Sequence, residues 1–167
     1  MVTTRAALEQ RGFLGFVPFS ALSRAGIPDT PGVYAVLRES LDPPAFLESS
    51  AACARPGRRG GPDRQATEQV AVLATKWVDA VEVVYIGKAD ARKRGGGLET
   101  RLTEYLLHGT GKRPKHWGGR YIWQLADHEE LLVAWLETAG DAAGVESAML
   151  KEFVLKTGRL PFANLRH

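Results

Sequence analysis

The chain has 167 residues, of which 44% are hydrophobic and 25% charged, with a formal net charge of +3. This length and composition fit one domain with a buried core, spanning 1–167, and no apolar run approaches the roughly 20 residues of a membrane span. The single cysteine, Cys53, excludes an internal disulfide framework, and residues 1–11 lack the apolar region of a secretory signal, so we expect a cytoplasmic protein with no membrane partner.

The first half of the chain predicts one strand followed by a long excursion. Residues 1–30 form a short helical or irregular lead-in, and the β-branched and aromatic run at 33–38 predicts a strand. Residues 42–64 are rich in Pro, Gly, Arg and Ala and predict a loop. Apolar residues at helical spacing then predict a helix over 66–78. The segment 38–80 is therefore an insertion between two core strands.

The second half predicts strands alternating with helices. A strand is expected from Val81 to Ile86, ending at Gly87, and an apolar stripe predicts a helix over 98–107. The apolar runs 121–125 and 131–136 predict further strands.

The last helix is expected over 145–156, with Gly158 as its stop signal. The whole order indicates an α+β fold. It would have a small antiparallel or mixed sheet of about three strands, flanked by helices in a two-layer domain, with the long insertion between the first two core strands.

Positive charge is concentrated in the middle of the chain. Between Lys88 and Arg120 there are nine Lys or Arg residues and three acidic residues. Such a segment is typical of a protein that binds the phosphate backbone, although a solvated basic surface has the same composition. The residues that we expect to contact nucleic acid are Arg92, Lys93, Arg94, Lys112, Arg113, Lys115, His116, Trp117 and Arg120.

An ordered series of polar residues runs through the predicted elements. Gly32-Val33-Tyr34 and Tyr85-Ile86-Gly87 lie in the first two strands, and Lys88 follows directly. Each tripeptide alone is typical of strand packing. Arg101 and Tyr105 lie one turn apart on the following helix. Glu146 opens the last predicted helix, and Asn164 follows Pro161.

This series resembles the GIY-YIG endonuclease family, which includes repair, homing and restriction nucleases. The resemblance covers residues 32–164 and depends on the order of the motifs. It implies a divalent-metal-dependent endonuclease that hydrolyses phosphodiester bonds in DNA. The catalytic residues that it implies are Tyr34, Tyr85, Lys88, Arg101, Tyr105, Glu146 and Asn164.

The residue types suit that chemistry. Glu146 is expected to bind one Mg²⁺ (or Mn²⁺) ion that keeps several of its waters. Arg101 offers a planar set of donors for the scissile phosphate. By family analogy Tyr34 is the general base and Tyr85 orients water or phosphate. Since an ordinary tyrosine titrates near 10, Lys88, Arg101 or the metal must stabilise the phenolate.

Structural roles stay open for several of these residues. Glu146 has the position of an acid near a helix N-terminus, and Asn164 that of a turn residue. Arg101 is also an ion-pair candidate for Glu99 or Glu104. His108 is interpreted, like His116, as a surface or substrate-contacting residue, because their spacing is not one that zinc sites use. Trp123 is expected in the core, and Trp117 is the better candidate for base stacking.

The chain also departs from the family pattern. The two tyrosine motifs are separated by the insertion, and residues 90–97 add a second one that carries three basic residues. No separate DNA-reading module is expected, so four sources of target choice stay open. They are the chain's own insertions, an accessory specificity protein, a homodimer, or no sequence preference at all. Two alternatives to a DNA endonuclease remain: a non-cleaving nucleic-acid-binding or regulatory module of the same fold, and a nuclease for structured RNA.

Overall fold

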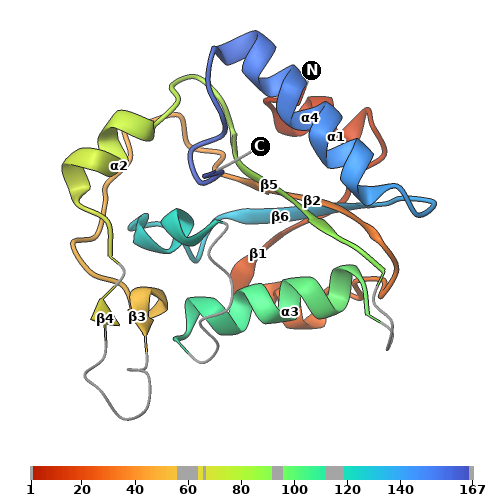
Figure 1. Ribbon diagram of the computed structural model, residues 1–167, viewed down its shortest axis with the longest axis horizontal. Helices are drawn as coiled ribbons and strands as arrows, with labels where there is room; N and C mark the ends of the chain where they lie inside the picture. Colours follow the sequence, from red (N-terminus) through yellow and green to blue (C-terminus); the bar gives the residue numbers. More distant parts are fainter. Residues whose placement is uncertain (1, 56–63, 66, 92–95, 112–118, 166–167) are drawn as a thin grey trace.

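A four-stranded antiparallel sheet forms the centre of the computed structural model (Figure 1). Its strand order is β1 (Leu14–Pro18), β6 (Leu132–Glu137), β2 (Gly32–Leu37) and β5 (Val83–Ala89). The α+β class is therefore confirmed, with four strands in place of about three. The structure describes residues 2–55, 64–65, 67–91, 96–111 and 119–165.

Helices cover both faces of this sheet. Because side chains alternate along a strand, Val33, Ala35 and Leu37 pack in one core with α1 (Arg5–Glu9) and α4 (Ala142–Thr157). Tyr34 and Val36 face the opposite core, which α3 (Leu98–Gly109) covers. Figure 1 shows α1 and α4 on one side of the strands and α3 on the other. The expected two-layer arrangement is wrong, since β2 is buried at every position and needs cover on both faces.

An aspartate caps the start of each of the two long helices, and α4 ends at the predicted stop signal, Gly158. Asp29 accepts hydrogen bonds from the backbone of Gly97 and Thr100, at 2.6 and 3.1 Å, and so caps the start of α3. In α4, the Asp141 carboxylate accepts a 2.9 Å bond from Gly144 N, and Gly158 ends the helix at a φ of 76°. Helix α4 therefore begins three residues before its predicted start, at Ala142.

The lead-in contributes a strand to the sheet, which the sequence did not predict. Strand β1 pairs with β6, and the 3₁₀ helix η1 (Phe19–Arg24) follows it directly. Pairing is irregular between Gly15 and Val17, and both Gly15 and Phe16 have positive φ. A bulge of this kind interrupts the alternation by which strands are recognised in a sequence.

The prediction of a strand at 121–125 is wrong. The apolar run forms the 3₁₀ helix η4 (Arg120–Gln124), preceded by Gly119 in a left-handed conformation. Residues Tyr121 to Gln124 are all buried. A short apolar run that is buried on all sides has the same composition in a helix as in a strand, so its pattern does not distinguish the two.

The insertion forms its own small elements beside the sheet. These are the 3₁₀ helix η2 (Ala51–Cys53), the antiparallel pair β3 (Ala54–Arg55) and β4 (Arg64–Gln65), and α2 (Val70–Lys76). Helix α2 is shorter than the predicted helix and buries Leu73.

The buried side chain of Arg38, which directly follows β2, holds the start of the insertion in place through hydrogen bonds. Its Nε lies 2.6 Å from an oxygen of Asp127, and its Nη1 donates to the carbonyls of Ser40 and Asp42 at 2.7 and 2.6 Å.

None of the helices in the described part of the chain has the length and apolar character needed to cross a membrane.

Candidate active site

Strands β2 and β5 bring the two tyrosine motifs together. In their antiparallel register Tyr34 lies opposite Gly87, and Tyr85 lies opposite Val36. The rings of Tyr34 and Tyr85 are 5.9 Å apart, and Tyr105 on α3 is 6.2 and 5.7 Å from them. All three rings are buried. The insertion therefore separates the motifs in sequence and leaves them adjacent in space.

Gly87 is required by this packing. A Cβ atom at this position would lie 2.6 Å from Cζ and 2.7 Å from the hydroxyl oxygen of Tyr34. Strand β5 does not end at Gly87, as the sequence predicted, but continues to Ala89. A glycine within a strand permits such a close approach without stopping the strand.

The three tyrosine hydroxyls have different environments. The Tyr105 hydroxyl donates a 2.7 Å hydrogen bond to the carbonyl of Gly119. Burial raises the pKa of Tyr34, while the Arg101 charge and hydrogen bonds with Tyr85 and Arg101 oppose this rise. Burial and the neighbouring Tyr34 raise the pKa of Tyr85 well above its ordinary value. Of these two tyrosines in facing strands, Tyr34 has the better-stabilised phenolate.

Glu146, on α4, belongs to the same region as Tyr34, Tyr85 and Tyr105, which we call the tyrosine cluster. It lies one turn inside the helix, so the expectation that it opens the helix is wrong, because Asp141 caps the helix earlier. Burial raises the pKa of Glu146, the charges of Lys88 and Arg101 oppose this, and Asp90 adds to it. Glu146 also acts electrostatically on Tyr34 and Tyr85. Residues from four elements therefore act on one another across a single region.

The cations of this region have acidic neighbours. Lys88 Nζ lies 3.0 Å from a carboxylate oxygen of Asp90, and Arg101 Nη1 lies 3.8 Å from one of Glu104. The ion-pair interpretation of Arg101 thus has a structural basis. The pair is long, however, and Arg101 also hydrogen-bonds to Tyr34. A phosphate could therefore compete for this guanidinium group.

Sequence reasoning missed Asp90, which follows the end of β5. It is an exposed carboxylate within electrostatic range of Glu146. Its only sequence signal is its position two residues after Lys88. A carboxylate whose pKa is raised by a second carboxylate, as that of Glu146 is by Asp90, is a setting in which a cation is favourable.

The carboxylates present fit a sparsely coordinated ion better than a protein-enclosed one. Among the described residues, no group of three or more His, Cys, Asp or Glu side chains is placed to hold a metal. Mg²⁺ needs only one or two carboxylates when it keeps its waters and also binds substrate phosphate. Glu146, with Asp90 close by, meets that requirement.

Asn164 is bound to the backbone of β5. Its Oδ1 accepts a 3.0 Å hydrogen bond from Ile86 N, and its Nδ2 donates a 2.8 Å bond to Ile86 O. Beside it, Ala163 N donates to Val84 O at 2.9 Å. The Asn164 backbone also closes a turn, because its N–H donates to the Pro161 carbonyl. Asn164 thus fixes the strand segment between Tyr85 and Gly87, which is a positioning role.

Most of the predicted nucleic-acid contacts lie outside the described residues. These are Arg92, Lys93, Arg94, Lys112, Arg113, Lys115, His116 and Trp117. Arg120 is described, and its guanidinium lies 4.8 Å from the ring centre of Tyr121 and 3.9 Å from Glu68. Trp123 is in the core, as predicted. The surface interpretation of His108 is wrong, because this residue is buried on the inner side of α3.

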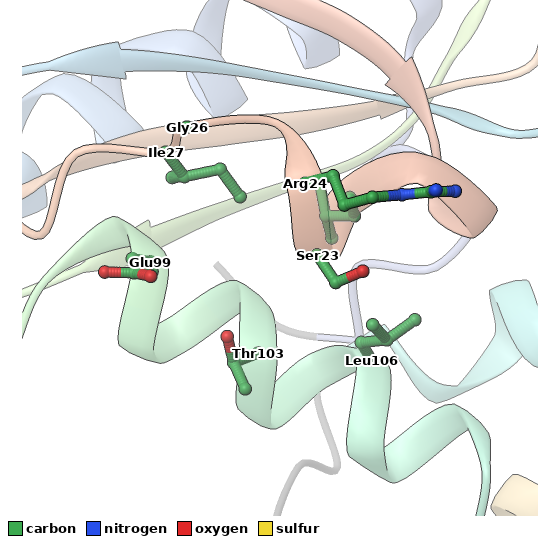
Figure 2. Close-up of a pocket in the computed structure, with 8 residues that line it drawn as sticks. Ser23, Arg24, Gly26, Ile27, Glu99, Thr103 and Leu106 are labelled. Carbon is green, nitrogen blue, oxygen red and sulfur yellow. The ribbon is translucent and has the colours of Figure 1, made fainter.

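A pocket of about 310 Å³ lies apart from these residues, between η1 and α3. Figure 2 shows Glu99, Thr103 and Leu106 of α3 facing Ser23 and Ile27 across it. Its lining includes none of the catalytic residues that the sequence predicted.

Comparisons of this chain with models of protein families, with curated proteins and with solved structures find no match.

Proposed function

We propose that this protein is a divalent-metal-dependent endonuclease of the GIY-YIG type that hydrolyses phosphodiester bonds in DNA. One observation supports this best. Tyr34, Tyr85, Arg101 and Glu146, which come from β2, β5, α3 and α4, interact in one region although the sequence separates them widely. Packing alone does not require a partly buried carboxylate and guanidinium near buried tyrosines, since removing charges from water is costly unless they are paired.

In the proposed mechanism, Arg101 binds the scissile phosphate through its planar donors. Tyr34 first releases its own proton to solvent, and the phenolate then accepts a proton from the attacking water. Arg101 and a hydrogen bond from Tyr85 stabilise this phenolate and oppose the rise in pKa that burial causes. Lys88 balances the charge of Glu146 and Asp90. Glu146 would hold the Mg²⁺ or Mn²⁺ ion, which supplies charge neutralisation at the leaving oxygen.

A second function has one observation in its favour. Tyr34 is only 1% exposed, so a water can reach its hydroxyl only if the site opens. A non-cleaving module that binds nucleic acid would have no such requirement. A structured RNA in place of DNA would use the same phosphate contacts, and it is tested as a second substrate.

The proposal is tested by incubating the pure protein with supercoiled plasmid or with a folded RNA, with Mg²⁺ or Mn²⁺. Tyr34→Phe is expected to lower the single-turnover rate about 100-fold or more, since a general base is removed. Glu146→Gln is expected to lower it to a similar extent. Matched controls are Tyr121→Phe, which loses only the bond to Glu68, and Glu129→Gln at an exposed position, and both should keep the wild-type rate.

Each outcome decides between the functions. Metal-dependent nicking that both site variants lose supports the nuclease. DNA binding without nicking under either metal overturns the nuclease in favour of the binding module. Cleavage of the folded RNA but not of the plasmid would show that the substrate is RNA and overturn DNA as the substrate. Equal nicking by wild type and Glu146→Gln identifies a contaminant and overturns the proposal.

We also propose a cellular compartment and partners for the enzyme. We place it in the cytoplasm with nucleic acid as its partner. A homodimer or an accessory protein would supply the target choice. Light scattering of the protein with and without a cleavage-resistant duplex would distinguish these two sources.

A further inference from the structure

A second cavity, of about 390 Å³, lies between helix α2 of the insertion and the segment that follows α4. Thr75 and Lys76 line it from α2, and Arg159, Leu160, Asn164 and Leu165 line it from the other side. We call this cavity the insertion groove. Figure 1 shows α2 beside the C-terminal part of the chain, at the β5 side of the sheet.

The insertion groove is positively charged. Lys76 and Arg159 are both exposed, and among the residues described for the lining there is no acid. Arg159 is held by a 3.1 Å hydrogen bond from its Nη1 to Trp77 O, and Lys76 Nζ lies 5.9 Å from the ring centre of Tyr121. Glu68 accepts a 3.0 Å bond from the Tyr121 hydroxyl. Two cations thus share one concave surface whose described lining includes no carboxylate.

The groove is joined to the candidate active site through Asn164. This residue lines the groove and is hydrogen-bonded to Ile86, whose chain neighbours are Tyr85 and Gly87. Helix α4 rises about 1.5 Å per residue, so Glu146 and the end of the helix, beside Arg159, are about 17 Å apart. A polymer bound in the active site would therefore reach the cations of the groove several nucleotides from the cut.

We propose that the insertion groove binds the sugar-phosphate backbone several nucleotides from the scissile phosphate, and that the insertion exists in part to supply its α2 wall. This inference rests on the proposed function. Lys76 and Arg159 match phosphate charges, and the apolar side chains of Leu160 and Leu165 suit the sugar. Backbone contacts of this kind position a strand and carry no sequence information.

The test measures binding of a fluorescent DNA duplex by anisotropy, in Ca²⁺ to suppress cleavage, over a range of salt concentrations. The double variant Lys76→Ala/Arg159→Ala is expected to bind about tenfold more weakly. Its plot of log affinity against log salt should be shallower by about 2, because two phosphate contacts are lost. The charge-matched control, Arg24→Ala/Lys151→Ala, changes two exposed cations on η1 and α4 and should keep the wild-type slope.

The contact is then located with duplexes that carry a single neutral methylphosphonate. One modified position several nucleotides from the cut is expected to weaken wild-type binding and to have no further effect on the double variant. If Arg159→Ala impairs folding, as thermal unfolding would show, Lys76→Glu compared with Lys151→Glu gives the same contrast. If the double variant keeps the wild-type salt slope and no modified position weakens wild-type binding, the proposed role of the groove is overturned.

These outcomes are separate from the fate of the proposed function. A wild-type protein that cleaves DNA while the groove variant keeps full affinity overturns the groove alone. A wild-type protein that binds without cleaving, with a slope that falls in the groove variant, supports the groove and overturns the nuclease. Absence of any nucleic-acid binding by the wild type overturns both.

Discussion

At the scale of single residues, Asn164 shows how a side chain can affect chemistry without touching the substrate. Its amide makes a donor and an acceptor bond to the same residue, Ile86, as a neighbouring strand would. These bonds fix the strand between Tyr85 and Gly87. Any substitution that changes the hydrogen-bonding pattern of the Asn164 amide should therefore change the positions of Tyr85 and Gly87.

This gives a prediction for Asn164→Asp, which keeps the shape and the acceptor but replaces the donor with a second acceptor. The carboxylate would face Ile86 O, so one bond is lost and repulsion is added. We expect the free energy of unfolding in urea to fall by about 1–3 kcal/mol. The cleavage rate should fall as well.

Asn164→Ala is the comparison for this variant. It removes both bonds without placing a charge against the carbonyl of Ile86, so its loss of stability should be the smaller of the two. Equal stability of wild type and Asn164→Asp would contradict the positioning role.

The catalytic candidates were accessible from the sequence because they belong to an ordered series with fixed residue types. The structure places Tyr34, Tyr85, Arg101 and Glu146 in one region, which agrees with that series, while their chemical roles stay predictions. Asp90 could not be found in this way, since its relation to Glu146 exists only after β5 and α4 have packed. The pairing of Asn164 with Ile86 likewise depends on a sheet edge that no local pattern encodes.

At the scale of elements, the lead-in offers a test of the sheet. Gly15 in β1 has a φ of 94°, and a Cβ there would lie 2.3 Å from the Trp135 ring of β6. Gly15→Ala is therefore expected to lose both backbone freedom and packing. We expect a fall of at least about 2 kcal/mol in the free energy of unfolding.

Gly26→Ala is the matched control for that substitution. Its φ of 64° imposes a similar left-handed strain, but no atom lies within 4 Å of the added Cβ. The loss should be about 1 kcal/mol, from the backbone alone. A Gly15→Ala variant no less stable than Gly26→Ala would mean that β1 does not pack on Trp135.

Element prediction succeeded where periodicity extended over several residues. The strand at 33–38, the helix at 98–107, the strand at 131–136 and the last helix are confirmed within a few residues. It failed at β1, because Gly15 and Phe16 adopt positive φ and break the alternation. It failed again at η4, where burial on all sides removes the polar face that would reveal the period.

At the scale of the whole molecule, the tyrosine cluster links stability to alkaline pH. Burial raises the pKa of Tyr34, Tyr85 and Tyr105 above the value of about 10 expected in the unfolded chain. The contribution of these three tyrosines to the free energy of unfolding is therefore fully present below about pH 10. Above it, the unfolded chain releases protons that the folded protein retains, and stability falls until the folded pKa values are passed.

We predict that the free energy of unfolding falls above pH 10 by about 1.4 kcal/mol per pH unit for each of the three tyrosines. Urea unfolding between pH 8 and pH 11 measures this slope. Tyr105→Phe should reduce the slope by the share of one tyrosine, whatever its effect at neutral pH. A slope that does not change in this variant would mean that Tyr105 ionises equally in both states.

The strand order has a consequence for the kinetics of folding. Strand β6 lies between β1 and β2, yet it begins at Leu132, long after both have been synthesised. Until it arrives, β1 has no partner in this sheet, and β2 has only β5. Such non-local pairing gives a high contact order, which slows folding and leaves apolar strand edges exposed to other chains. The yield of active protein should therefore depend on chain concentration and on chaperones during synthesis more than its final stability would suggest.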